Sequence, residues 1–317
     1  MSWTVIRLEE NNRYMKKYII HALSVFLKYF FLKRQVMILH KQKKITSINF
    51  HDPTLEIFQK HIELLKKHNF DFLSLQQVYD FINGHSQPSK ASVFITFDDG
   101  WKGNLKLVPY IERNNIPVCI FLNTRPVQRK GIFWNKAAMK YPDLLPEPYN
   151  HNPSKLYDIS NKERIKITDQ LEELLPPDYS RDSFSIVEIK ELAKNPLISF
   201  GVHTHSHTMT TQCEMSELEY EIAENIHFIE EWTSQNICAF AYPNGRHDGR
   251  EVNILEKHEV KLAFKQNNAF IDDYNNVFLI PRFGCVERSF PESICKATGL
   301  WKKFTRLKPS ALLNIKQ

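Results

Sequence analysis

The run Ser92–Phe97 constrains the fold more than any other stretch of this sequence. After the first serine, each of its residues is β-branched or aromatic, and Asp98, Asp99 and Gly100 end the run. An unbroken run of this kind is typical of a parallel strand that is buried on both faces. Parallel strands are joined by crossover helices that cover the sheet, so the run predicts an α/β fold.

Other parts of the chain repeat this alternation. Short apolar runs predict further strands at 36–39, 117–123, 197–202, 238–242 and 277–280. Apolar residues at helical spacing predict helices at 58–67, 73–82, 105–114, 186–193, 215–232 and 250–258. We therefore expect a mostly parallel sheet, open or closed into a distorted (β/α) barrel, with the helices outside.

The domain organisation follows from the same pattern. A length of 317 residues suits one catalytic barrel with appendages. We expect an N-terminal helical region at 1–35, the barrel domain at 36–288 and a C-terminal tail at 289–317. The segment 135–185 is rich in Pro, Asn, Lys and Glu and breaks the alternation, so it is expected to insert helices at the rim.

Composition excludes several classes of protein. Hydrophobic residues make up 42% of the chain, enough for a large core, and the net charge of +6 is spread along the sequence. This charge pattern gives no reason to expect a nucleic-acid partner. The five cysteines contain no C-x-x-C pair, which favours a reducing, cytoplasmic location over a disulfide framework.

The N-terminal stretch 18–32 is apolar and lies between Lys16-Lys17 and Lys33-Arg34. Its about 15 residues fall short of the roughly 20 that span a bilayer, and no small-residue cleavage site follows. We therefore expect neither a spanning helix nor a cleaved signal peptide. An amphipathic helix docked on the domain is the favoured prediction. The alternative is peripheral contact with the inner face of the membrane through residues 18–32.

Two groups of polar residues directly follow predicted strands. Asp98 and Asp99 point in divergent directions, so one carboxylate can hold a metal ion while the other faces a bound water. His203 and His207 lie four residues apart and can converge on one ion, for which imidazole suits Zn²⁺, Co²⁺ and Ni²⁺. In isolation the first group is also compatible with a simple turn and the second with a solvated loop.

A third feature is the turn at Tyr242, Pro243 and Asn244, directly after the predicted strand 238–242. Backbone N–H groups in such a turn can donate hydrogen bonds to an oxyanion. A plain turn without chemical function is the alternative.

These features, in this order, resemble the polysaccharide deacetylases, which are carbohydrate esterase family four with a NodB homology domain. The first family motif matches Thr96–Gly100, and the second, H-T-x-x-H, matches His203 and His207. The third motif, normally R-x-P-Y, reads A-Y-P-N at 241–244 and lacks the Arg. It is similar to the F-A-Y-P-x-G form of deacetylases that act on biofilm poly-N-acetylglucosamine. The resemblance spans 36–288.

The resemblance implies a role for each matched residue. Asp98 would be the general base, and Asp99, His203 and His207 would hold one divalent metal ion, with Zn²⁺ expected first and Co²⁺ or Ni²⁺ as alternatives. The backbone N–H of Asn244 would stabilise the oxyanion.

In the similar branch the domain is circularly rearranged, and the catalytic His comes from an N-terminal Y-H motif. Leu39-His40 occupies that place, so the resemblance implies His40 as the general acid, with a buried structural His as the alternative. Arg282 follows a predicted strand and is a candidate to replace the missing Arg and tune Asp98. Otherwise it is a surface charge.

Aromatic residues near the strand ends are candidates for stacking on sugar rings. Trp101 and Tyr242 are such candidates, with Pro243 beside them, although a core role for the tryptophan is an equal alternative.

The implied activity is metal-dependent removal of N-acetyl groups from an amino sugar in a polysaccharide or glycolipid. An O-acetyl esterase and a deformylase of formamido sugars are the alternatives within the same fold. An inactive glycan-binding module is a further alternative because the third motif has lost its Arg. Both aspartates and both histidines are present, which favours an enzyme, since a pure binder has no need of a base beside the ligands.

Overall fold

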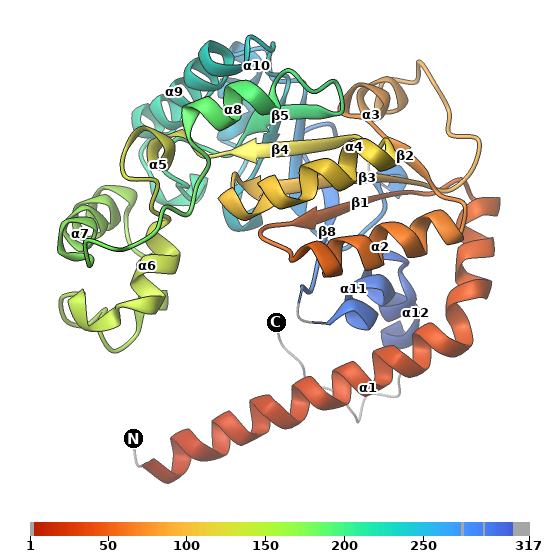
Figure 1. Ribbon diagram of the computed structural model, residues 1–317, viewed down its shortest axis with the longest axis horizontal. Helices are drawn as coiled ribbons and strands as arrows, with labels where there is room; N and C mark the ends of the chain where they lie inside the picture. The colour runs from red at the N-terminus through yellow and green to blue at the C-terminus, as the bar shows by residue number, and fades with distance from the viewer. Residues whose placement is uncertain (1–2, 274–275, 288, 307–317) are drawn as a thin grey trace.

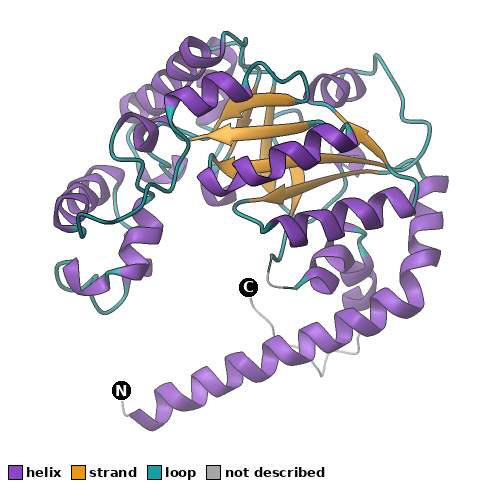
Figure 2. Ribbon diagram, in the orientation of Figure 1, coloured by secondary structure: helices purple, strands orange, loops and turns teal. Residues whose placement is uncertain are grey.

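The computed structural model describes residues 3–273, 276–287 and 289–306. These residues form a sheet of parallel strands surrounded by helices (Figures 1 and 2). The strands are β1 (Ile45–Phe50), β2 (Asp71–Leu73), β3 (Ser92–Asp99), β4 (Val118–Leu122), β5 (Ile198–Val202), β6 (Ala239–Ala241), β7 (Leu262–Gln266) and β8 (Ile280–Gly284).

The sheet closes on itself because β1 pairs with both β3 and β8. The other neighbours follow in the order β8, β7, β6, β5, β4 and β3, while β2 pairs with the first half of β3 outside the ring. Seven of the described strands thus form a closed parallel barrel, and the prediction of a distorted (β/α) barrel is confirmed.

The helices lie outside this ring. They are α1 (Trp3–Lys41), α2 (Leu55–Lys67), α3 (Leu75–Ile82), α4 (Val108–Asn114), α5 (Thr124–Gln128), α6 (Trp134–Lys140), α7 (Asn161–Leu174), α8 (Ile186–Leu192), α9 (Met215–Thr233), α10 (Glu251–Lys257), α11 (Phe290–Ala297) and α12 (Leu300–Arg306).

The barrel interior changes in character along the strands. At its middle, Phe264 lies 5.5 Å, ring to ring, from both Phe94 and Phe121. Gly201 leaves room for this cluster, because a Cβ atom there would stand only 2.6 Å from the Phe121 ring. Beyond the aromatic rings, towards the carboxyl ends of the strands, the inward side chains are polar, and the candidate site begins there.

The expectation of a strand at 36–39 was wrong. Residues 36–39 are not a strand but the last turns of α1, in which Val36 and Leu39 are buried and Met37 is 65% exposed. The first strand is β1, which the sequence pattern missed because its inward residues Ser47 and Asn49 are polar. A short apolar run cannot by itself distinguish a helix from a strand.

The segment 135–185 forms α6 and α7 with short 3₁₀ turns between them. It has a small apolar core of its own, which includes Ala137, Leu156, Ile167 and Leu171. Figure 1 shows these two helices standing to one side of the barrel, beside the carboxyl ends of β3 and β4.

The N-terminal helix docks on the barrel domain through its second half. Along the bottom of Figure 1, α1 runs beneath α11 and α12 before it turns towards β1. Leu27, Leu32, Val36 and Leu39 on this side of α1 are buried in the main core. The described part of the predicted tail, as α11 and α12, is therefore part of the packed domain. No described helix has the length and apolarity that crossing a bilayer requires.

Candidate active site

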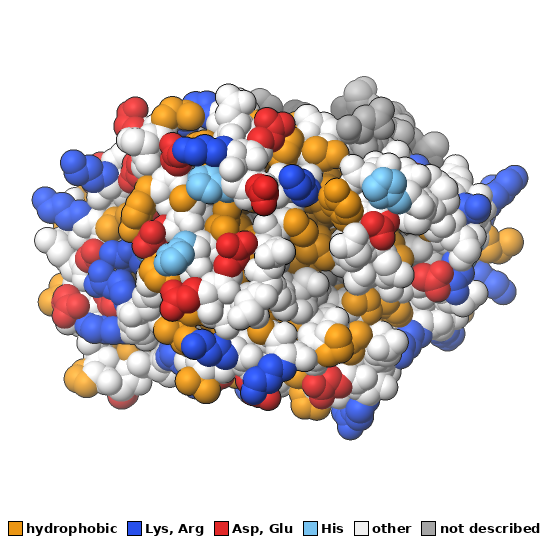
Figure 3. Space-filling view, turned by 90° about the horizontal axis from the view of Figure 1, so that it is seen from above, with side chains coloured by type: hydrophobic (Ala, Val, Ile, Leu, Met, Phe, Trp, Pro, Cys, Tyr) orange, Lys and Arg blue, Asp and Glu red, His pale blue; other side chains and the backbone are white. Residues whose placement is uncertain are grey.

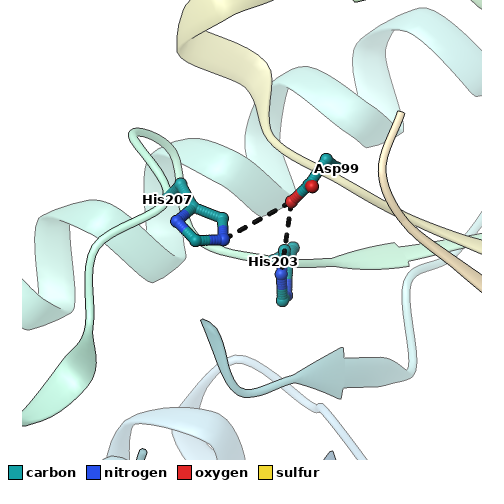
Figure 4. A group of neighbouring side chains, drawn as sticks. All are labelled: Asp99, His203 and His207. Carbon is teal, nitrogen blue, oxygen red and sulfur yellow. Dashed lines mark ion pairs between the residues drawn. The ribbon is translucent and has the colours of Figure 1, made fainter. Parts of the chain in front are cut away.

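Three side chains converge at the carboxyl ends of β3 and β5 (Figure 4). The Oδ1 atom of Asp99 lies 3.5 Å from Nε2 of His203 and 3.4 Å from Nε2 of His207. One ligand atom from each residue lies within 4.8 Å of the other two. Asp99 and His203 are buried and His207 is nearly so, which gives a compact set of one carboxylate and two imidazoles.

The backbone at these residues is held in an uncommon conformation. Asp99, Thr204 and His207 all have positive φ angles, of 72°, 61° and 54°. Non-glycine residues with such angles persist only where the surrounding structure enforces them, often at functional sites. Here Thr208 donates its N–H to the hydroxyl of Thr204, and buried Glu221 accepts from the N–H of Ser206. These bonds fix the tight loop that returns His207 to His203.

The donor set fits a divalent ion of intermediate softness. Among the described residues, Oδ1 of Asp99 is buried and has no hydrogen-bond donor. Nδ1 of His203 donates to the carbonyl of Ala241 at 2.7 Å, which leaves the lone pair of Nε2 directed at Asp99. Burial lowers the pKa of His207 to about 4, so this imidazole is neutral at neutral pH. One carboxylate and two imidazoles suit Zn²⁺, Co²⁺ or Ni²⁺.

Asp98 faces the barrel interior, where its negative charge is balanced by Arg282. Arg282 of β8 donates to both of its carboxylate oxygens, at 2.7 and 2.9 Å, and Asn49 of β1 donates to Oδ2 at 2.8 Å. Burial raises the pKa of Asp98, but Arg282 and His203 outweigh that effect and hold the pKa well below the usual range. From the sequence, a surface charge was the alternative interpretation of Arg282. In the structure its side chain is completely buried against Asp98.

Trp101 and Asn244 lie at the border of this group. The indole N–H of Trp101 donates to Oδ2 of Asp99 at 3.0 Å, which orients that carboxylate so that Oδ1 faces the histidines. Asn244 is exposed and has a φ of 54° in the turn after β6. That turn begins close to Ala241, whose carbonyl holds His203. Pro243, the first residue of the turn, is buried.

Two residues do not lie where the sequence analysis expected them. Tyr242 is 1% exposed and donates its hydroxyl to the carbonyl of Phe278, so it has no free face for a sugar ring. His40 lies in the last turn of α1, where its Nε2 donates to the carbonyl of His68 and its Nδ1 accepts from the N–H of Ala91.

Ala91 directly precedes β3, so His40 lies at the opposite end of that strand from Asp98 and Asp99. Eight strand residues span about 25 Å, which is too far for proton transfer to a group at the site. The expectation that His40 is the general acid is therefore wrong.

His51 is the histidine that the sequence analysis missed. It directly follows β1, its backbone N–H donates to Glu287 at 3.0 Å, and its carbonyl accepts from Asn104 at 3.0 Å. Its side chain is exposed. Phe50 pairs with Phe97 in the parallel sheet, so His51 follows β1 at the same level of the barrel at which Asp98 follows Phe97. The signal was Phe50-His51, an aromatic residue followed by His.

Comparison with known protein families agrees with the resemblance found in the sequence motifs. The sequence profile of the polysaccharide deacetylase family matches residues 85–263, which is more than half of the chain. No curated protein sequence matches.

Solved structures share the fold at low sequence identity. The Streptococcus pyogenes deacetylase PplD in complex with acetate has a TM-score of 0.59 and 17% identity, covering 80% of this chain and 98% of that one. IcaB from Ammonifex degensii has a TM-score of 0.58 and 16% identity, covering 81% and 97%. The deacetylase domain of BpsB from Bordetella bronchiseptica has a TM-score of 0.54 and 12% identity, covering 77% and 97%.

Proposed function

This chain belongs to the polysaccharide deacetylase family, and from that premise we propose that it is a metal-dependent de-N-acetylase. Its substrate would be an N-acetylated amino sugar in a polysaccharide or glycolipid, and its products would be acetate and a free amino sugar. The observation that carries the proposal is the convergence of Asp99, His203 and His207 beside a second, differently held carboxylate, Asp98.

Asp99, His203 and His207 would hold one divalent ion, which when bound lowers the pKa of a water molecule and polarises the acetamide carbonyl. The two aspartates then have different tasks. Asp99 contributes a carboxylate oxygen to the ion, with Trp101 holding its other oxygen. Asp98 stays ionised beside Arg282 and accepts the proton of the attacking water.

Attack of water on the acetamide carbon forms a tetrahedral oxyanion, to which the backbone N–H of Asn244 would donate. One such donor typically contributes about 3 kcal/mol. The C–N bond then breaks, and the amine leaves with a proton that His51 supplies. His51 replaces His40 in this role because it follows β1 at the end of the barrel where the metal ligands lie.

The proposal is tested by acetate release from N-acetylglucosamine oligomers, with O-acetylated and N-formylated glycans in parallel. The enzyme is stripped with a chelator and then supplied with Zn²⁺, Co²⁺ or Ni²⁺. Acetate release from the N-acetyl substrate that depends on added metal supports the proposal. Faster turnover of the O-acetyl or N-formyl substrate, or full activity in the metal-free enzyme, would contradict it.

Two aspartate variants separate the two tasks. Asp98→Asn should bind zinc with unchanged stoichiometry and lose turnover, whereas Asp99→Ala should lose both. Asp71→Asn is the matched control, because this aspartate begins β2 at the opposite end of the sheet and pairs with Lys90. If Asp98→Asn emptied the metal site, the two assignments would have to be exchanged.

A further inference from the structure

The outer face of α1 is apolar although it is open to solvent. The exposed residues of α1 between positions 18 and 32 are Tyr18, Ile19, His21, Ala22, Val25, Phe26, Tyr29, Phe30 and Phe31. The ring of His21 contacts Ser289 of the domain, and we call the other eight residues of this set the outer face. It contains no Lys, Arg, Asp or Glu, and the exposed fraction reaches 82% at Tyr29 and 73% at Tyr18. Soluble monomers rarely expose apolar patches of this kind unless something binds there.

The opposite side of the same helix is firmly attached to the domain. Cys295 of α11 donates its thiol to the carbonyl of Ser24, and Gln35 donates to the carbonyl of Thr298. Lys28 lies 4.9 Å above the ring of Phe290. These contacts fix the rotation of α1 about its axis, so the outer face points away from the domain as part of the folded structure.

The rings on the outer face pack against one another along the helix. Phe26 lies 4.7 Å from Phe30 and 6.1 Å from Phe31, and Tyr29 lies 5.0 Å from Phe30. Tyrosine and phenylalanine are side chains that favour the boundary between water and lipid tails. From Tyr18 to Phe31 the face extends for about 20 Å along the helix axis.

The charges at the two ends of the outer face distinguish between a second copy of the chain and a lipid surface as its binding partner. The outer face is bounded by exposed Lys17 at one end and by exposed Lys33 and Arg34 at the other. If a second copy of the chain covered it, either parallel or antiparallel pairing of the helices would bring these like charges together. An anionic lipid surface would instead match both basic ends.

We propose that the outer face of α1 binds peripherally to a membrane surface that contains anionic phospholipid. The helix lies in the plane of the interface, with its aromatic rings among the lipid tails and its basic ends at the headgroups. The face of the molecule away from α1, seen from above in Figure 3, instead mixes acidic and basic side chains and is suited to water.

The geometry also links this surface to the catalytic end of the barrel. Ring nitrogen Nδ1 of His21 lies 3.0 Å from the hydroxyl of Ser289, in the segment that follows β8. The same segment carries Glu287, which accepts from the N–H of His51. A helix bound to lipid would therefore hold the catalytic rim near the membrane, where glycolipids or surface glycans are met. This consequence alone rests on the proposed function.

Flotation of the full chain with vesicles tests the proposal without using activity. Vesicles of phosphatidylcholine alone are compared with vesicles of equal parts phosphatidylcholine and phosphatidylglycerol. We expect the protein to float with the anionic vesicles and to be released in part by added salt. The double variant Phe26→Glu with Tyr29→Glu should reduce the bound fraction about tenfold or more, and Lys33→Glu with Arg34→Glu should reduce it to a smaller extent.

Val187→Glu is the matched control, because Val187 on α8 is 78% exposed and lies outside α1, so this variant should float like the wild type. Circular dichroism of every variant reports whether the chain has folded. Wild-type protein that stays unbound with both vesicles would overturn the proposal. So would a glutamate double variant that floats as well as the wild type. A wild-type dimer that becomes monomeric in the glutamate variant, without flotation, would assign the face to self-association instead.

Discussion

Replacing Arg282 with methionine should destabilise the fold more than most single substitutions, because it leaves Asp98 as an unpaired buried charge. Both groups are nearly inaccessible, with exposed fractions of 0% and 4% for the side chains, and they share two hydrogen bonds of 2.7 and 2.9 Å. In such a bidentate pair the centres of the two charged groups lie about 4 Å apart, and two unit charges at about 4 Å attract by about 4 kcal/mol at an effective dielectric constant of 20. Removing one partner of a buried pair costs about 3–5 kcal/mol.

The two figures agree, so Arg282→Met should lower the free energy of unfolding by about 4 kcal/mol, a factor of about 10³ in the equilibrium constant. Urea unfolding of the metal-free protein measures this loss as a shift of the midpoint at constant slope. Adding Asp98→Asn to the variant removes the stranded charge and should restore part of the stability. A loss below about 1 kcal/mol, or a double variant no more stable than Arg282→Met, would show that the unpaired charge of Asp98 does not determine the stability of the variant.

Three further predictions concern single side chains. His51→Ala should slow amide hydrolysis about 10²–10⁴-fold but largely spare an activated aryl acetate, whose leaving group needs no proton; equal losses on both substrates would argue against His51. His40→Ala should leave both rates unchanged, because His40 lies at the other end of β3. Loss of amide hydrolysis in a folded His40→Ala variant would make His40 a candidate for the general acid again. Glu221→Gln should weaken zinc affinity about tenfold by loosening the bond to Ser206, and calorimetry showing native affinity would count against that role.

The proposed metal ligands could be located from the sequence because local patterns mark them directly. Asp98 and Asp99 end an unmistakably buried strand, and His203 and His207 follow another, so parallel pairing alone brings them to one end of the barrel. The ordered motifs then distinguished this arrangement from ordinary turns. The contacts that hold Asp98 were harder to foresee, because Arg282 reaches it across the barrel from β8.

The sequence pointed to His40 rather than His51 as the candidate general acid for a physical reason. A barrel with polar residues inside its carboxyl end does not show the apolar pattern of a buried strand there. Because Ser47 and Asn49 are polar, β1 lacks an unbroken apolar run and was not recognised as a strand. The apolar residues at 36–39 were interpreted as the first strand instead. Those residues are apolar because one side of α1 packs on the core. Once β1 is placed at Ile45–Phe50, His51 follows from the same rule that located the aspartates.

The sequence also could not show which residues of α1 contact the domain and which form the outer face. The apolar stretch 18–32 was compatible with docking or with lipid contact, and the structure shows that docking uses only one side of the helix. The helical repeat places most of the aromatic residues on the side of α1 that does not contact the domain, so they stay exposed.

The central claim is that Asp99, His203 and His207 hold one catalytic metal ion. A crystal of the zinc-supplied enzyme, with anomalous scattering recorded on both sides of the zinc absorption edge, tests it most directly. We expect one strong anomalous peak per chain, within coordination distance of a carboxylate oxygen of Asp99 and of Nε2 of both histidines. No peak at that position, or a zinc ion held by other residues, would show that these three residues do not form the metal site.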